Sequence, residues 1–183
     1  MKSYYDLANT KISIPTACCL GNFDGVHLGH QSLINMLLMK ARKSNLDSVI
    51  LTFDPHPSKI LKPCKCDPLI FTLDQKERIL REFDIDHLIF APFTQEFAKK
   101  SYEEFFYDIL VDKINAKIVV IGFDYRFGHK GKGNAEVLTE LCLKEGIEPV
   151  VLPPVMKDNK IVSSTLVRNL VQAGDVVRAQ SYM

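Results

Sequence analysis

The chain has 183 residues, of which 46% are hydrophobic and 25% charged, and its formal net charge at pH 7 is +1. This balance is typical of a single globular domain with a substantial core and argues against intrinsic disorder. The small net charge provides no basic field for nucleic acid or an anionic membrane, so neither is predicted as a partner.

The N-terminal segment and the cysteines bear on cellular location. Residues 1–7 lack the apolar stretch of a signal peptide, and no apolar run is long enough to cross a bilayer. Of the five cysteines, Cys18, Cys19 and Cys142 fall in a predicted strand or helix, which is typical of reduced thiols in a cytoplasmic protein. Residues 64–66 read Cys-Lys-Cys, but no second Cys or His pair completes a zinc site, so none is predicted.

Apolar runs alternate with helix-periodic segments along the chain. We predict strands over Thr16–Leu20, Ser48–Phe53, His87–Ala91, Lys117–Gly122 and Pro149–Pro153, and helices near His30–Lys43, Leu73–Phe83, Tyr102–Lys113 and Asn134–Glu145. The proline-rich residues 54–68 are predicted to be an extended loop that forms a lid or a pocket wall. The alternation predicts one α/β domain over residues 1–183, with a Rossmann-like, doubly wound parallel sheet.

Residues 21–30 read Gly-Asn-Phe-Asp-Gly-Val-His-Leu-Gly-His and connect the first predicted strand to the first predicted helix. Glycines let the backbone turn sharply, and a helix N-terminus offers unpaired N–H groups and the positive end of its dipole. His27 and His30, three residues apart, are predicted to lie side by side as hydrogen-bond donors. The segment therefore predicts a phosphate site. The alternative is one surface histidine and one structural histidine at a helix start.

Residues 163–168, Ser-Ser-Thr-Leu-Val-Arg, are predicted to begin a short helix. Ser163 or Ser164 is a suitable N-cap, and Gly174 is a suitable residue to end the helix. On their own these residues fit a capped helix with a solvated arginine. Beside a phosphate loop they also fit a second anion site, in which hydroxyls, N-terminal amides and Arg168 hold the β- and γ-phosphates.

Two further motifs follow predicted strands. Residues 122–128 read Gly-Phe-Asp-Tyr-Arg-Phe-Gly. Asp124 is suited to accept hydrogen bonds from a ribose or heterocycle, whereas Phe127 or Tyr125 can stack on a flat ring or belong to the core. In Thr-Phe-Asp-Pro-His-Pro, His56 lies between two prolines, either in a structural turn or in a site. Because the carboxyl ends of parallel strands share one sheet edge, we expect both motifs to meet residues 22–30 there.

Together, and in this order, the motifs resemble the FMN adenylyltransferase module of bacterial FAD synthetases, within the His-x-Gly-His nucleotidyltransferase superfamily. Connecting segments at Thr72–Arg78, Phe93–Phe97 and Ser101–Phe105 resemble that family as well. The resemblance covers nearly the whole chain and implies the nucleotidyltransferase fold. It also implies that the chain transfers AMP from ATP to FMN, giving FAD and pyrophosphate with Mg²⁺.

The resemblance further implies roles for individual residues. Those implied to be catalytic are His27, His30 and Arg168. Those implied to bind the phosphates of ATP are Gly21, Asn22, Phe23, Asp24, Gly29, Ser163, Ser164 and Thr165. Those implied to lie in the flavin or nucleotide pocket are His56, Leu61, Phe105, Gly122, Asp124, Arg126 and Phe127. No direct metal ligand is assigned, because Mg²⁺ keeps several waters and binds mainly through substrate phosphates. Asp24 is a candidate, with shaping of its own turn as the alternative.

Bifunctional members of that family carry a β-barrel riboflavin kinase domain after this module, and the chain has no room for one. We therefore expect no riboflavin phosphorylation, with FMN supplied by a separate riboflavin kinase; a stand-alone enzyme and a truncated one remain alternatives. Two other functions are also open. One is a nucleotidyltransferase for another phosphorylated acceptor, and the other is a non-catalytic flavin- or nucleotide-binding module.

Overall fold

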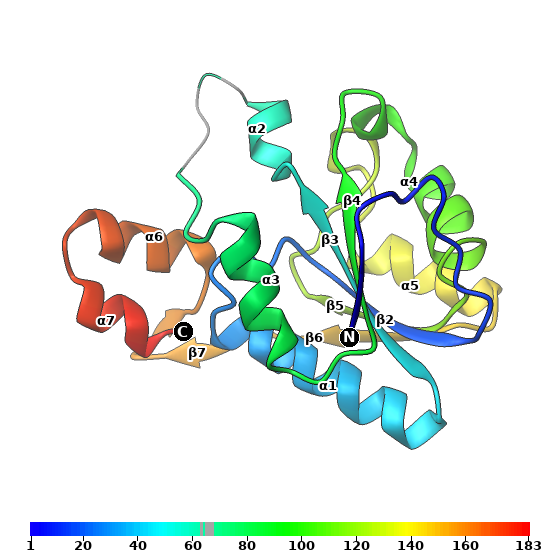
Figure 1. Ribbon diagram of the computed structural model, residues 1–183, viewed down its shortest axis with the longest axis horizontal. Helices are drawn as coiled ribbons and strands as arrows, with labels where there is room; N and C mark the ends of the chain where they lie inside the picture. Colours follow the sequence, from blue (N-terminus) through cyan, green and yellow to red (C-terminus); the bar gives the residue numbers. More distant parts are fainter. Residues whose placement is uncertain (63, 65–67) are drawn as a thin grey trace.

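The structure, a computed structural model, describes residues 1–62, 64 and 68–183. Its centre is a six-stranded sheet in the order β1-β4-β3-β2-β5-β6, in which every neighbouring pair is parallel (Figure 1). The strands are β1 (Lys2–Tyr4), β2 (Thr16–Leu20), β3 (Asp47–Asp54), β4 (His87–Pro92), β5 (Ala116–Gly122) and β6 (Glu148–Leu152). The chain adds strands on one side of β2 and then on the other, so the predicted doubly wound, Rossmann-like sheet is confirmed.

Helices connect the strands and cover both faces of the sheet. They are α1 (Leu28–Ser44), α2 (Pro57–Leu61), α3 (Leu73–Arg81), η2 (Phe97–Lys99), α4 (Tyr102–Glu104), η3 (Phe105–Val111), η4 (His129–Gly131), α5 (Ala135–Lys144), α6 (Ser164–Gln172) and α7 (Val176–Ser181). A two-stranded hairpin, β7 (Met156–Lys157) with β8 (Lys160–Ile161), precedes α6.

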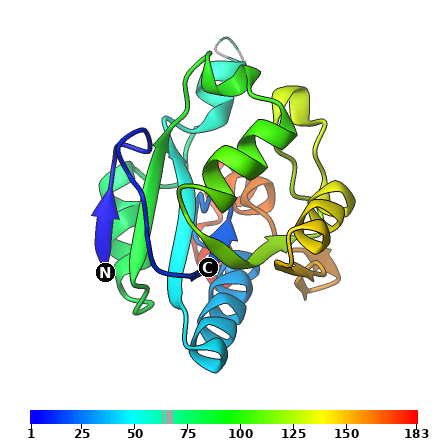
Figure 2. The ribbon, with the colours of Figure 1, turned by 90° about the vertical axis from the view of Figure 1, so that its right-hand side faces the viewer.

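The two sheet faces carry separate cores. On one face, α1 contributes Ile34 and Leu37 and α3 contributes Leu80; on the other, η3 and α5 pack against the strands, as Figure 2 shows for the green and yellow helices. Every residue of β2 is buried. A strand covered on both faces reads as a continuous apolar run, which is why β2 to β5 were predictable.

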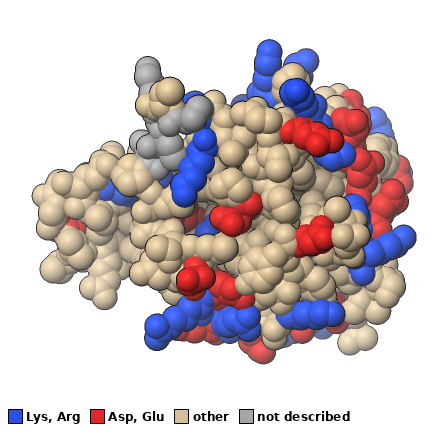
Figure 3. Space-filling model, turned by 45° about the horizontal axis from the view of Figure 1, so that its top comes forward, with Lys and Arg blue, Asp and Glu red and all other residues tan. Residues whose placement is uncertain are grey.

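The C-terminal segments form a lobe beside the sheet. Its small core contains Val162, Val167, Ala179 and Tyr182. The backbone carbonyl of Tyr182 accepts a hydrogen bond from the amide of Leu28 at 2.9 Å, which connects the lobe to the first residue of α1. On the face shown in Figure 3, charges of both signs are interspersed over the main body, whereas the lobe on the left shows few.

The structure corrects two predictions and adds elements. Residues 54–68 are not one extended loop, because Pro57–Leu61 form α2, with Pro57 in the first turn and His56 as N-cap. Residues 102–113 are not a regular helix, because α4 passes into the π-helical turns of η3. The sequence analysis did not anticipate the short elements β1, β7, β8 and α7.

The structure also bears on the cysteines and on the search for membrane-spanning segments. Cys18, Cys19 and Cys142 are buried free thiols. Part of the Cys-Lys-Cys segment lies outside the described residues. No helix in the described part of the chain has the length and apolarity needed to cross a membrane.

Candidate active site

A cavity of about 630 Å³ opens at the carboxyl ends of β2, β3 and β5. It lies where the order of strands reverses, the usual ligand site of a doubly wound sheet. The predicted site residues that line it are Gly21, Asn22, His27, Gly29, His30, His56, Leu61, Phe105, Gly122, Asp124, Arg126, Phe127, Ser163, Ser164, Thr165 and Arg168. Phe23 and Asp24 are buried and are not part of the lining.

The segment from Gly21 to His27, the phosphate loop, turns tightly into α1. Phe23, Gly25 and Val26 have positive φ angles of 50°, 83° and 39°. A β-branched residue in this region is strained, so the surrounding structure must hold Val26 in place. His27 is the N-cap of α1, and its Nδ1 accepts from the amide of His30 at 3.3 Å. The neutral His27 ring therefore carries its proton on Nε2.

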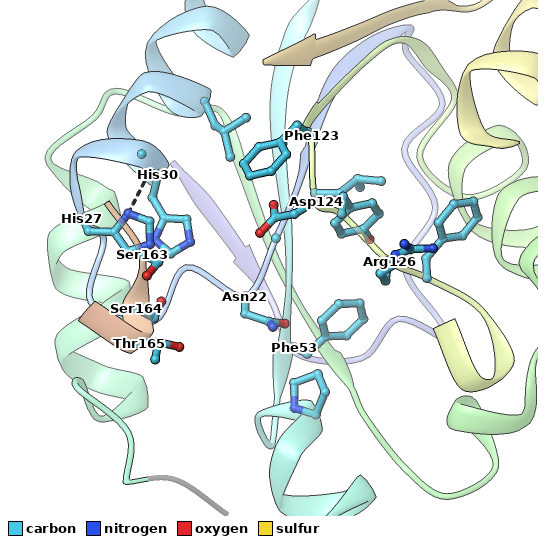
Figure 4. A pocket seen from close by; sticks show the side chains of 18 of the residues that line it. Asn22, His27, His30, Phe53, Phe123, Asp124, Arg126, Ser163, Ser164 and Thr165 are labelled. Atoms are coloured by element: carbon cyan, nitrogen blue, oxygen red, sulfur yellow. Dashed lines mark hydrogen bonds between the residues drawn. The ribbon is translucent and has the colours of Figure 1, made fainter. Parts of the chain in front are cut away.

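The two histidines lie face to face, as predicted. Their ring centroids are 3.7 Å apart with an interplanar angle of 19° (Figure 4). Burial lowers the pKa of His27 from 6.5 to about 4. Burial, His27 and the nearby Lys76 together hold the pKa of His30 well below 6.5. Both rings are therefore neutral at pH 7, so each has one ring N–H to donate and neither carries a positive charge.

The lowered pKa of His27 predicts acid destabilisation. The unfolded chain takes up this proton near pH 6.5, whereas the folded chain takes it up only near pH 4. Stability is therefore full above pH 6.5 and falls as the pH approaches 4, by about 2 kcal/mol at pH 5 relative to pH 7. We expect His27→Gln to flatten the pH dependence of the free energy of unfolding, measured by urea titration. An unchanged pH slope in that variant would contradict this assignment.

Asp24 links three segments around the phosphate loop. Its Oδ1 accepts from the amides of Ile70 and Phe71 at 3.0 and 3.3 Å, and its Oδ2 lies 3.1 Å from Nη2 of Arg168. Its backbone carbonyl accepts from Oγ of Ser164 at 2.8 Å. The side chains of Asp24 and Arg168 are 2% and 11% exposed, so this ion pair is shielded from water. These contacts show that Asp24 shapes the site.

The N-terminus of α6 faces the phosphate loop. Ser163 is its N-cap, with Oγ accepting from the amide of Leu166 at 3.2 Å, and Thr165 is exposed. Figure 4 shows Ser163, Ser164 and Thr165 beside the two histidines. The first turns of α1 and α6 thus both border the cavity. In α1 the amides of Leu28 and His30 already donate within the protein, so the first turn of α6 is the richer source of amides for an anion. Arg168 is anchored at the same place, because its Nε also donates to the carbonyl of Pro68 at 2.8 Å.

The opposite end of the cavity is aromatic. Phe53, Phe93, Phe97, Phe105 and Phe127 form linked ring contacts with centroids 5.4 to 6.3 Å apart. Phe127, which stacks on Tyr125, is 6% exposed and belongs largely to this buried cluster.

Phe123 and Asp124 enter the cavity from the end of β5. Phe123 is 45% exposed and lies beside Asp124, on the side of the cavity across from the serines (Figure 4). Phe123 is therefore the more accessible platform for a flat ring than Phe127. Gly133 allows the backbone to pack closely against the Phe127 ring, because a Cβ at this position would lie 2.6 Å from that ring.

A family model of FAD synthetases matches residues 9–166. The chain belongs to the FAD synthetase family. It is 35% identical to a bifunctional riboflavin kinase/FMN adenylyltransferase of Buchnera aphidicola subsp. Schizaphis graminum, over 86% of this chain and 51% of that protein. It is 31% identical to a FAD synthetase of Listeria monocytogenes serovar 1/2a, over 99% of this chain and 73% of that protein.

A solved structure shares the fold of this chain. A crystal structure described as a macrolide-efflux protein from Streptococcus pneumoniae has a TM-score of 0.86 and 31% identity, covering 100% of this chain and 60% of that chain. The chain spans about half the length of the Buchnera relative. The family resemblance inferred from the motifs is confirmed.

Mg²⁺ is implied by the resemblance to the FAD synthetase family. Among the residues that the structure describes, no group of three or more His, Cys, Asp or Glu side chains could hold a metal ion. Both carboxylate oxygens of Asp24 are engaged by protein donors. The donor set fits an ion that arrives on substrate phosphates and keeps its waters.

Several cavity residues were missed from the sequence. Phe53, Phe93, Phe97 and Phe123 line the cavity, as do Pro153 and Val155 near the end of β6. Phe123 had a local signal, since it directly precedes Asp124. The other phenylalanines resemble ordinary core residues, and only the three-dimensional arrangement shows that they form one wall.

Proposed function

We propose that this chain transfers AMP from ATP to FMN, forming FAD and releasing pyrophosphate. The observation that carries this proposal is the layout of the cavity. Two helix N-termini, two neutral histidines and Arg168 lie at one end, and an aromatic wall lies at the other. A triphosphate fits the first end, and a flat isoalloxazine ring fits the second.

In the proposed reaction, an oxygen of the FMN phosphate attacks the α-phosphorus of ATP. The new O–P bond forms in line with the bond to the β-phosphate bridging oxygen, which breaks and leaves with its electron pair as pyrophosphate. His27 donates from Nε2 to a phosphoryl oxygen, and His30 acts beside it. The amides of α1 and α6 and the Arg168 guanidinium stabilise charge on the departing group. Mg²⁺, carried on the ATP phosphates, supplies further charge neutralisation.

We further propose that residues 1–183 form one adenylyltransferase domain and do not phosphorylate riboflavin. The described strands of the main sheet form one continuous sheet, four of them line the cavity, and the family match lies within residues 9–166. FMN would then come from a riboflavin kinase. The buried free thiols of Cys18, Cys19 and Cys142 support a reducing compartment, the cytoplasm.

The test is to incubate the purified chain with ATP, Mg²⁺ and either FMN or riboflavin, and to separate the flavins by chromatography. We expect FAD from FMN and no conversion of riboflavin. No FAD from FMN would contradict the proposed activity. Flavin fluorescence would then distinguish a non-catalytic flavin-binding module from a nucleotidyltransferase with another phosphorylated acceptor.

A further inference from the structure

Lys76 is a buried lysine on α3, the helix between the α6–α7 lobe and the sheet in Figure 1. Its exposure is 6%, which is rare for lysine unless a carboxylate pairs with it. Among the described residues, none of the ion pairs within 4.0 Å includes Lys76. Its Nζ instead donates to the backbone carbonyl of Asn22 at 2.9 Å and to Oγ1 of Thr52 at 3.5 Å.

These contacts place Lys76 directly behind the phosphate loop. Asn22 is the second residue of that loop and lines the cavity, near the centre of the view in Figure 4. Thr52 also donates to the Asn22 carbonyl, at 3.0 Å. The Asn22 carbonyl therefore keeps one hydrogen-bond donor if Lys76 is replaced. The need to pair this carbonyl does not by itself explain why an ammonium group is buried here.

The charge of Lys76 reaches groups that line the cavity. It lowers the pKa of both His30 and His56. Asp24 and Asp54 face the ammonium group and raise its pKa, whereas burial, the larger effect, lowers it. Arg168 adds a second positive charge near His56. Asp24 and Asp54 balance the positive charge of Lys76 only from a distance. An anion bound at the phosphate loop would balance this charge as well.

We propose that Lys76 is a positioning residue for the phosphates of ATP. It holds the Asn22 turn of the phosphate loop from behind and lends that loop a positive charge shielded from water. The inference rests on the proposed function for the identity of the anion. The proposal also explains why a lysine is buried at this position. An apolar side chain of similar volume is often at least as stabilising to the fold as a buried charge, so stability alone does not favour lysine.

The test compares Lys76→Met with Arg78→Met, which removes one positive charge from an exposed position on the same helix. For Lys76→Met we expect a Tm equal to or above that of the wild type. We also expect ATP affinity, measured by calorimetry, and kcat/KM for FAD formation each to fall at least 10-fold. The acid limb of the pH profile should move to higher pH, because the neighbouring imidazoles lose a positive neighbour. Arg78→Met should match the wild type in all four measurements.

Two outcomes would overturn the role of Lys76. One is wild-type ATP affinity and kcat/KM in Lys76→Met. The other is a loss of activity that only parallels a loss of Tm, with the acid limb unmoved, which indicates a structural residue. A wild-type chain that binds ATP but forms no FAD would instead overturn the proposed function. In that case the ATP affinities of the wild type and Lys76→Met would still test the role of Lys76.

Discussion

Replacing His30 by alanine is expected to lower kcat for FAD formation by about 100- to 1,000-fold, the usual loss for one donor to a developing oxyanion. Nδ1 of His30 is buried and has no hydrogen-bond partner among the described residues. The ring stacks on His27 and borders the cavity, which is the arrangement expected of a side chain that binds a ligand there. Folding should therefore survive the substitution, and the loss should appear in kcat.

The control for this prediction is His129→Ala. His129 lies in η4 outside the lining of the cavity, so its loss should leave kcat unchanged. Steady-state kinetics on both variants, with thermal unfolding to verify folding, makes the comparison. A His30→Ala variant that forms FAD at the wild-type rate would remove His30 from the proposed mechanism. If kcat and Tm fall together, the ring supports the fold.

The features predicted correctly from the sequence have local causes. Ser163 caps α6 because its side chain reaches the amide of Leu166, three residues ahead, at 3.2 Å. Gly174 ends α6 with a positive φ of 79°. The stacking of His27 on His30 follows from their spacing across the first turn of α1.

The features that were missed depend on distant partners. β1 has half-buried or exposed residues and exists because its backbone pairs with β4, more than 80 positions away. Lys76 lies among charged residues of α3 and reads as part of a solvated helix face. It becomes buried only because α3 packs over Asn22 and Thr52. No pattern within the helix could have shown this.

Asp24 illustrates the same limit within the candidate site. The sequence analysis left metal binding and turn shaping as alternatives for this carboxylate. The partners of this carboxylate in the structure, Ile70, Phe71 and Arg168, are separated from Asp24 by 46 to 144 positions in the sequence. Because these partners come from separate segments, Asp24 joins the phosphate loop to α6, and its removal should affect stability and activity together.

Replacing Asp24 by alanine is expected to lower the free energy of unfolding by about 3–5 kcal/mol, the range for removing one partner of a buried ion pair. The variant deprives the Arg168 guanidinium of this carboxylate and the amides of Ile70 and Phe71 of their acceptor. FAD formation should also fall, because α6 and the phosphate loop lose a shared contact. Asp24→Asn, which keeps an amide-accepting oxygen but no charge, should lie between alanine and wild type. Urea titration at pH 7 measures each difference.

Asp84→Asn provides the matched control, because Asp84 pairs with Arg42 at 3.4 Å with side chains that are 92% and 70% exposed. An ion pair in water is worth little, so this variant should unfold at the wild-type urea concentration. The comparison holds the chemistry of the substitution constant, whereas burial and the number of segments joined differ strongly between the two sites. If Asp24→Asn were as stable as Asp84→Asn, the buried pair with Arg168 would contribute no net stability. The alignment of α6 with the phosphate loop would then have to come from the Ser164 contact and the apolar packing around Val167.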